Sequence, residues 1–347
     1  MRLERDSLIK TAGYLFVGLI AYVFITFFLT GLAFVANQSG AVVDIWPVST
    51  YQQVIYNRST RNIWQYQKDC IQADPYVIYA PAPGECAFSN MEFDTVLNFD
   101  ELGRSVPART PDNDPSGGNE PGIAILGDSH AMGWGVNDDE TFANVLQTGT
   151  AKPVYNLAVS SYGTVREIRR LVQSGFLDRV DTIIIQYCDN DLGENTSDID
   201  FQAEADTFAA TLKTHVEPGK RTQSNHLAAI LTTRMLRKAL TIPLRPIRDF
   251  FATALGLRKK DFAPHFAALK TVLKNHERQL AGKKIIIFYS NAHGNRFDNF
   301  EDFAFEGMGD VRLVDLSIPR DLYFLLDDHL NVDGHKFIGD RLAGLID

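Results

Sequence analysis

A serine and a histidine stand side by side in the stretch AILGDSHAMG, at positions 124–133. A serine hydroxyl is a weak nucleophile until a base removes its proton, and histidine suits that task because its pKa lies near neutrality. Ser129 is therefore a candidate nucleophile. The alternative is that Ser129, or Asp128 before it, only caps the helix that follows. We assign no role to His130.

Five short apolar runs after position 122 predict the elements that would position this serine. They are IAIL at 123–126, VYNLAV at 154–159, DTIIIQY at 181–187, KIIIFYS at 284–290 and VRLVDL at 311–316. Each is continuous and rich in β-branched residues, as strands buried on both faces are. Helices are expected between them, at 140–148, 163–175, 203–215 and 261–281. Strands alternating with helices predict a three-layer α/β/α sandwich with a mostly parallel five-stranded sheet.

Polar residues follow the predicted strands, where ligands bind in open α/β sheets. Ser129 follows the first strand, and Gly163 follows the second in NLAVSSYGT. Asn190 follows the third in YCDND, and His329 lies near the C-terminus in LLDDHLNVDGH. We expect these four residues to meet at one edge of the sheet.

In this order, the four blocks resemble those of the SGNH hydrolases, also called the GDSL family, over roughly residues 122–347. The resemblance implies a flavodoxin-like fold, with Ser129 as the nucleophile and His329 as its base. It also implies three donors to the oxyanion of the tetrahedral intermediate. These are the backbone N–H groups of Ser129 and Gly163 and the side-chain amide of Asn190.

The chain departs from the family pattern in two places. Cys188 stands where the third block usually has glycine, and position 326 is leucine where the last block usually has aspartate. Asp327 is then the nearest carboxylate for orienting His329, a spacing similar to that in SGNH-like polysaccharide acetyltransferases. Asp328 is the alternative for this role.

The C-terminal block also contains five possible metal ligands, namely Asp327, Asp328, His329, Asp333 and His335. Their spacing matches no helical H-x-x-x-H site, and no second histidine cluster precedes them. We therefore expect neither a metal nor another cofactor, and His335 is expected to begin a terminal helix.

Residues 12–36 contain no charged side chain, and 25 residues at about 1.5 Å each exceed the roughly 30 Å hydrocarbon thickness of a bilayer. We expect a single-pass anchor after a cytoplasmic tail at 1–11, because basic residues outnumber acidic ones in that tail. The catalytic domain would then be periplasmic or extracellular. A cleaved signal peptide is the alternative, although its apolar core normally runs only about 7–15 residues.

Between the anchor and the hydrolase-like domain at 122–347 lies a membrane-proximal region at 37–121, which we expect to contain few strands. It ends in a linker rich in Pro, Gly, Asp and Asn at 107–122. A basic insertion at about 220–260 interrupts the hydrolase-like domain. This insertion could lie on anionic lipid or hold an acidic glycan, and the alternative is a solvated helical pair packed on the core.

Cysteine usage and charge narrow the function classes further. Outside the cytoplasm, Cys70 and Cys86 could form a disulfide that leaves Cys188 unpaired, and three unrelated thiols are the alternative. The formal net charge of −9 argues against general nucleic-acid binding, which needs a basic surface.

These observations predict a membrane-anchored serine esterase or O-acyltransferase that works through an acyl-enzyme. Its substrate would be an O-acylated small molecule or glycan, with acetyl groups on a cell-envelope carbohydrate or lipid as one option. A catalytically silent SGNH-like domain that binds glycan or a membrane partner is the alternative, and a metal-dependent hydrolase is a third possibility.

Overall fold

The computed structural model describes residues 2–101, 103–109, 121–150, 152–215, 233–254, 261–291, 297 and 299–346. The chain divides into two compact units. The first consists of Met1–Arg61, Pro218–Arg258 and Leu325–Asp327, and the second of Asn62–Glu217, Lys259–Phe324 and Asp328–Asp347. Most of the expected linker at 107–122 lies outside the described residues.

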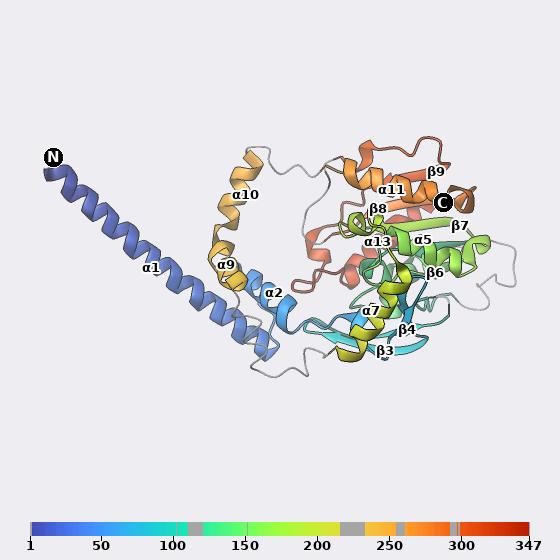
Figure 1. Ribbon diagram of the computed structural model, residues 1–347, viewed down its shortest axis with the longest axis horizontal. Coiled ribbons are helices and arrows are strands. Elements are labelled where there is room, and N and C mark those ends of the chain that lie inside the picture. Colours follow the sequence, from blue (N-terminus) through green and yellow to red (C-terminus); the bar gives the residue numbers. More distant parts are fainter. Residues whose placement is uncertain are drawn as a thin grey trace. The chain divides into compact units, whose positions relative to one another are not determined.

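The second unit contains a five-stranded parallel sheet in the order β6-β5-β7-β8-β9 (Figure 1). The strands are β5 (Gly122–Leu126), β6 (Val154–Asn156), β7 (Val180–Tyr187), β8 (Lys284–Tyr289) and β9 (Asp310–Val314). The predicted strands are thus present, and β6 is shorter than expected. It ends at Asn156, whose side chain bonds to the Ala158 amide and the Ala131 carbonyl and so interrupts the extended backbone.

Alternate residues of each strand face opposite helical layers. Ile123 and Ile125 of β5 belong to a buried cluster that includes α4 (Phe142–Gly149) and α13 (Val332–Ile346). Ala124 and Leu126 belong to a second cluster that includes α5 (Thr164–Gln173) and α11 (Ala263–Asn275). The sheet is therefore buried on both faces, and the predicted three-layer α/β/α sandwich is confirmed.

The other helices described in this unit are α3 (Ser129–Met132), α6 (Asp191–Asn195), α7 (Phe201–Thr214) and α12 (Glu277–Leu280). Single 3₁₀ turns lie at Trp64–Tyr66, Asp138–Glu140, Phe176–Arg179, Phe300–Asp302 and Arg320–Leu322.

The expectation of few strands before the linker was wrong. Four strands form two antiparallel pairs there, β1 (Ile71–Asp74) with β2 (Ile78–Pro81) and β3 (Gly84–Asn90) with β4 (Phe93–Phe99). Alternation along β4 buries Thr95, Leu97 and Phe99 and exposes the residues between them, which is the pattern of a strand covered on one face. Cys70 and Cys86 form a disulfide next to these strands, as the cysteine analysis allowed, and Cys188 is a free thiol.

The first unit is helical. It consists of α1 (Arg2–Ser39), α2 (Val48–Ser59), α9 (Thr233–Thr241), a 3₁₀ turn at Ile242–Leu244 and α10 (Arg245–Ala254). The stretch Lys10–Ser39 of α1 is long and apolar enough to cross a membrane. Large apolar side chains along it, such as Tyr14 and Phe24, are exposed. Residues 220–232 and 255–260 of the expected basic insertion lie outside the described residues.

A buried arginine fixes the loop that follows α3. The Arg104 guanidinium donates to the carbonyls of Met132, Gly133 and Val136 and pairs with Asp138 at 2.8 Å. The Arg104 side chain is fully buried, so each of these partners has been taken out of water together with it. The guanidinium therefore holds the turn between α3 and the next helical segment in one conformation.

Replacing Arg104 by methionine should destabilise the protein by about 3–5 kcal/mol, because Asp138 would be left as a buried charge without its cation. The measurement is the free energy of unfolding of the detergent-solubilised full chain in urea. Arg312→Met is the matched control, since the Arg312–Asp310 ion pair is exposed and should contribute no more than about 1 kcal/mol. Equal losses in the two variants would contradict this account of Arg104.

Candidate active site

A tight turn between β5 and α3 presents Ser129. Gly127 has a φ of +150°, and a Cβ there would lie 2.6 Å from the Ala131 Cβ, so only glycine fits. The Asp128 carboxylate then accepts from the His130 amide at 2.9 Å and caps α3. Ser129 is thereby fixed as the first residue of the helix, beyond the carboxyl end of the strand.

The structure brings the predicted nucleophile and base into direct contact. The His329 Nε2 lies 2.7 Å from the Ser129 Oγ, and both side chains are buried in the same unit. The imidazole stacks on the Trp134 indole at 4.5 Å between ring centroids, with an angle of 10° between the planes. The His130 ring lies 4.9 Å from it. His329 is therefore held in a defined orientation in which a serine proton can pass to Nε2.

Asn190 also reaches this site. Its side-chain Nδ2 donates to the Asp128 Oδ2 at 3.3 Å, next to Ser129 in the chain. Gln186 accepts from the Asp128 amide at 3.1 Å and holds the turn from the other side. Burial raises the pKa of Asp128, and the hydrogen bonds from His130 and Asn190 and the charge of His329 oppose that rise. The third sequence block thus meets the first, as predicted.

The Gly163 N–H, a predicted oxyanion donor, is bonded to a carboxylate in this structure. It donates to the Glu194 Oε2 at 3.0 Å, and Glu194 also pairs with Arg166 at 2.7 Å. A Cβ on Gly163 would lie 2.8 Å from the Glu194 Cβ, so the side chain of Glu194 is what requires glycine at this position.

Asp191, like Glu194, accepts hydrogen bonds at the N-terminus of α5. Its carboxylate accepts from the Thr164 amide at 2.8 Å, the Thr164 hydroxyl at 2.7 Å and the Cys188 amide at 2.8 Å. Burial raises the pKa of Asp191, and these hydrogen bonds oppose the rise. Burial also raises the pKa of the Cys188 thiol. The anion-binding amides at the start of α5 are therefore satisfied by the protein's own carboxylates.

Ser161 has a strained backbone near Gly163. It lies in the same loop as Gly163 and has a φ of 63°, in the left-handed region. Within the described part of the chain, its N–H has no hydrogen-bond acceptor, whereas the Gly163 N–H has one. No feature of the sequence distinguishes these two amides, because their partners depend on where α6 lies.

The two candidate orienting carboxylates have different partners. The Asp327 carboxylate is buried, accepts from the Tyr56 hydroxyl and pairs with Arg61 at 3.0 Å, all within the first unit. The Asp328 carboxylate pairs with Arg320 at 3.2 Å, and Asp328 has a φ of 64°.

The possible metal ligands of the C-terminal block are also dispersed. His335 lies inside α13, where its Nδ1 accepts from the Phe142 amide at 3.2 Å, and burial lowers its pKa to about 3. Asp333 is exposed. In the ranges that the structure describes, no group of three or more His, Cys, Asp or Glu side chains is arranged to hold a metal ion.

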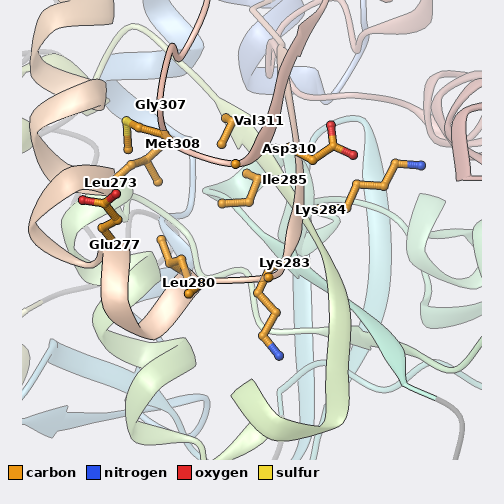
Figure 2. A pocket seen from close by; sticks show the side chains of 13 residues that line it. Leu273, Glu277, Leu280, Lys283, Lys284, Ile285, Gly307, Met308, Asp310 and Val311 are labelled. Atoms are coloured by element: carbon orange, nitrogen blue, oxygen red, sulfur yellow. The ribbon is translucent and has the colours of Figure 1, made fainter.

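A cavity of about 390 Å³ lies at the amino ends of β8 and β9, whereas Ser129 follows the carboxyl end of β5 (Figure 2). Its charged side chains are largely engaged elsewhere. Lys283 donates to the carbonyls of Leu177 and Val180, and Lys284 donates to that of Leu345. The cavity is thus separate from the Ser129–His329 pair.

Glu167 is a buried carboxyl group behind the active site. It is only 2% exposed, and neither of its oxygens has a hydrogen-bond partner among the described residues. Burial, followed by the charges of Asp191, Asp128 and Glu194, raises the pKa of Glu167 well above its usual value. Burial therefore favours the protonated form of the Glu167 carboxyl group in the folded protein.

Glu167→Gln should gain stability relative to wild type as the pH rises. A carboxyl group with a raised pKa stays protonated in the folded protein while the unfolded chain loses its proton above about pH 4.3, so wild-type folding becomes less favourable with rising pH. Glutamine removes this dependence. The readout is the difference in Tm between the detergent-solubilised full chains, measured from about pH 5 to pH 8.

Glu204→Gln, at an exposed position of α7, controls for the change of residue type and should show no such trend. A difference between Glu167→Gln and wild type that stays constant with pH would contradict a neutral Glu167.

Comparisons with known proteins complete this description. No protein-family model and no curated protein matches the chain. Among solved structures, a protein from Desulfitobacterium hafniense described as lipolytic and of the G-D-S-L family is similar, with 12% identity and a TM-score of 0.37 over 65% of this chain and 99% of that one.

A carbohydrate esterase family 2 enzyme from Corynascus thermopiles matches with 13% identity and a TM-score of 0.36, over 66% of each chain. A protein from Parabacteroides merdae described as a GDSL-like lipase matches with 13% identity and a TM-score of 0.32, over 65% of this chain and 98% of that one.

Proposed function

We propose that this protein cleaves or transfers O-acyl esters through an acyl-enzyme on Ser129. The observation that carries the proposal is the 2.7 Å contact between the Ser129 hydroxyl and the His329 Nε2. Both side chains are buried, and Ser129 follows the carboxyl end of β5, where open α/β sheets bind ligands. A serine activated by a histidine is the arrangement used for acyl transfer.

In the proposed reaction, His329 Nε2 takes the Ser129 proton as Oγ attacks the ester carbonyl. The carbonyl electron pair moves onto oxygen and forms a tetrahedral oxyanion. This intermediate collapses, the alcohol leaves with the proton returned by His329, and the acyl group stays on Ser129. Water or a sugar hydroxyl then attacks the acyl-enzyme through the same steps.

The oxyanion needs preorganised donors, each worth about 10²–10³ in rate. The Ser129 N–H, which has no acceptor within the described residues, and the Asn190 amide fit this role. Gly163 fits it less well, because its N–H is engaged by Glu194. Gly163 stays the predicted second backbone donor, and its N–H would have to exchange its bond with Glu194 for one with the oxyanion.

Asp327 stays the carboxylate predicted to orient the base. With Nε2 of His329 directed at Ser129, Nδ1 is the ring nitrogen that an orienting carboxylate would bond. The ion pair with Arg61 at 3.0 Å holds the Asp327 carboxylate in a fixed position. Asp328, which pairs with Arg320, stays the alternative.

For location, we propose that α1 anchors the chain as a single-pass membrane protein with a cytoplasmic N-terminus. Lys10–Ser39 spans about 45 Å as a helix, enough to cross a bilayer, and its exposed apolar side chains are suited to lipid contact. The catalytic unit would then lie on the periplasmic or extracellular side. There, O-acyl groups on a cell-envelope carbohydrate or lipid are the substrates that we propose.

Ser129→Ala should reduce hydrolysis of p-nitrophenyl acetate by at least about 10³-fold, because the nucleophile is lost while the fold is kept. The measurement is kcat/KM of the full chain in detergent micelles. Ser197→Ala is the matched control, since the exposed Ser197 hydroxyl bonds only to the Gly193 carbonyl beside it. It should retain wild-type activity.

If wild-type protein turns over the ester and Ser129→Ala does so equally well, the proposed mechanism is wrong. If folded wild-type protein turns over neither this ester nor acetylated glycans, the catalytically silent binding domain becomes the better explanation.

A further inference from the structure

The basic insertion contributes a helical segment that packs on α1. This segment, here called the basic hairpin, consists of α9, the turn at Ile242–Leu244 and α10, within Thr233–Ala254. Ala239 and Ile242 belong to the same buried cluster as Ala33 of α1. The Tyr22 hydroxyl of α1 donates to the Leu240 carbonyl. The basic hairpin therefore contacts the stretch Lys10–Ser39, which is the proposed membrane span.

The end of α9 carries an unusually complete set of caps. The last carbonyls of a helix have no partner within the helix, and in water they are simply hydrated. Here the hydroxyl of Thr241 donates to the carbonyls of Arg237 and Lys238. The hydroxyl of Tyr51 donates to the carbonyl of Ala239, and that of Tyr22 to the carbonyl of Leu240.

Four successive carbonyls, from Arg237 to Leu240, are thus satisfied by side chains of the protein itself. Internal satisfaction of the backbone is what a helix end requires where water is scarce, as at the level of lipid chains. The end of α9 therefore keeps these carbonyls bonded within the protein where it packs on α1, as a position next to lipid would require.

The following helix exposes an apolar stripe. Leu244, Ile247 and Phe251 are 46%, 59% and 57% exposed. Their spacing of three and four residues places them on one face of α10. Arg248 and Arg245 follow on the next edge of the helix, the first exposed and the second half-buried. An apolar face bordered by basic side chains is the pattern of a helix that lies in a membrane interface.

The positive charge of this segment favours anionic lipids. Thr233–Ala254 contains five basic residues and one acidic residue, Asp249, although the whole chain has a net charge of −9. Basic side chains near a bilayer are attracted to anionic headgroups. The long aliphatic parts of Arg and Lys let their charged groups reach the lipid phosphates when the helix backbone lies deeper in the bilayer.

We propose that the basic hairpin docks into the leaflet on the side of the catalytic unit and binds anionic phospholipid headgroups through Arg237, Lys238, Arg245 and Arg248. This inference rests on the proposed anchoring by α1. It is independent of the chemistry at Ser129.

The test places an environment-sensitive fluorophore on Ile247→Cys in the full chain, in a Cys188→Ser background. The labelled protein is reconstituted in nanodiscs of phosphatidylcholine with or without phosphatidylglycerol. We expect lipids with a nitroxide near the headgroup to quench the label about twofold more than lipids with a nitroxide near the chain end, and phosphatidylglycerol to increase this quenching. Label at Thr207→Cys, an exposed position of α7, gives the reference for unquenched emission.

Arg245→Gln with Arg248→Gln should weaken the docked state by roughly tenfold or more, seen as loss of quenching at position 247. Quenching that is unchanged by these substitutions and by phosphatidylglycerol would overturn headgroup binding.

Label at Phe24→Cys separates this inference from the anchor. If the label at position 24 is quenched by chain-end nitroxide and the label at position 247 is quenched by neither lipid, α1 is embedded and the docking of the basic hairpin is wrong. If neither position is quenched, the anchor itself is wrong and the inference falls with it.

Discussion

The hydrogen bond between Ser129 and His329 joins two residues that are 200 positions apart in the sequence. The sheet provides one end of this contact, because β5 stops at a glycine that no other residue could replace and turns directly into α3. The other end depends on a loop after β9. There the Phe324 amide donates to the His329 carbonyl at 2.8 Å, and Tyr323 pairs with Leu330. The proposed chemistry needs both ends to be rigid, and the turn at Gly127 and the bonds around His329 make them so.

Charged side chains that have bonding partners within the protein lie on both sides of this contact. Arg104 holds the loop that carries Trp134, and Trp134 stacks on the imidazole of His329, so a cation outside the site helps to orient the base. On the other side, Asp191 and Glu194 occupy the first amides of α5. Those amides would otherwise attract an anionic ligand. The Ser129 N–H has no acceptor among the described residues and is a donor that we propose for the oxyanion.

The sheet could be predicted from the sequence because its strands are buried on both faces and therefore appear as unbroken apolar runs, as in IAIL before Gly127. The contact of Ser129 with His329 was implied by the resemblance of their sequence blocks to those of the SGNH hydrolases. The strands at 71–99 were missed because they are half-exposed and interrupted by Pro and Gly. The partner of Gly163 was missed for another reason, since it depends on the placement of Glu194, which lies 31 positions away. The orienting role of Asp327 stays a prediction.

The most direct test of the central claim is to treat the detergent-solubilised full chain with a fluorophosphonate and to map the modified residue by peptide mass spectrometry. Such reagents form a covalent bond with a serine only when a neighbouring base has activated it. We predict a single adduct on Ser129 that is lost when His329 is replaced by alanine. An adduct on a different serine, or no adduct on a folded protein that still hydrolyses esters, would contradict the account.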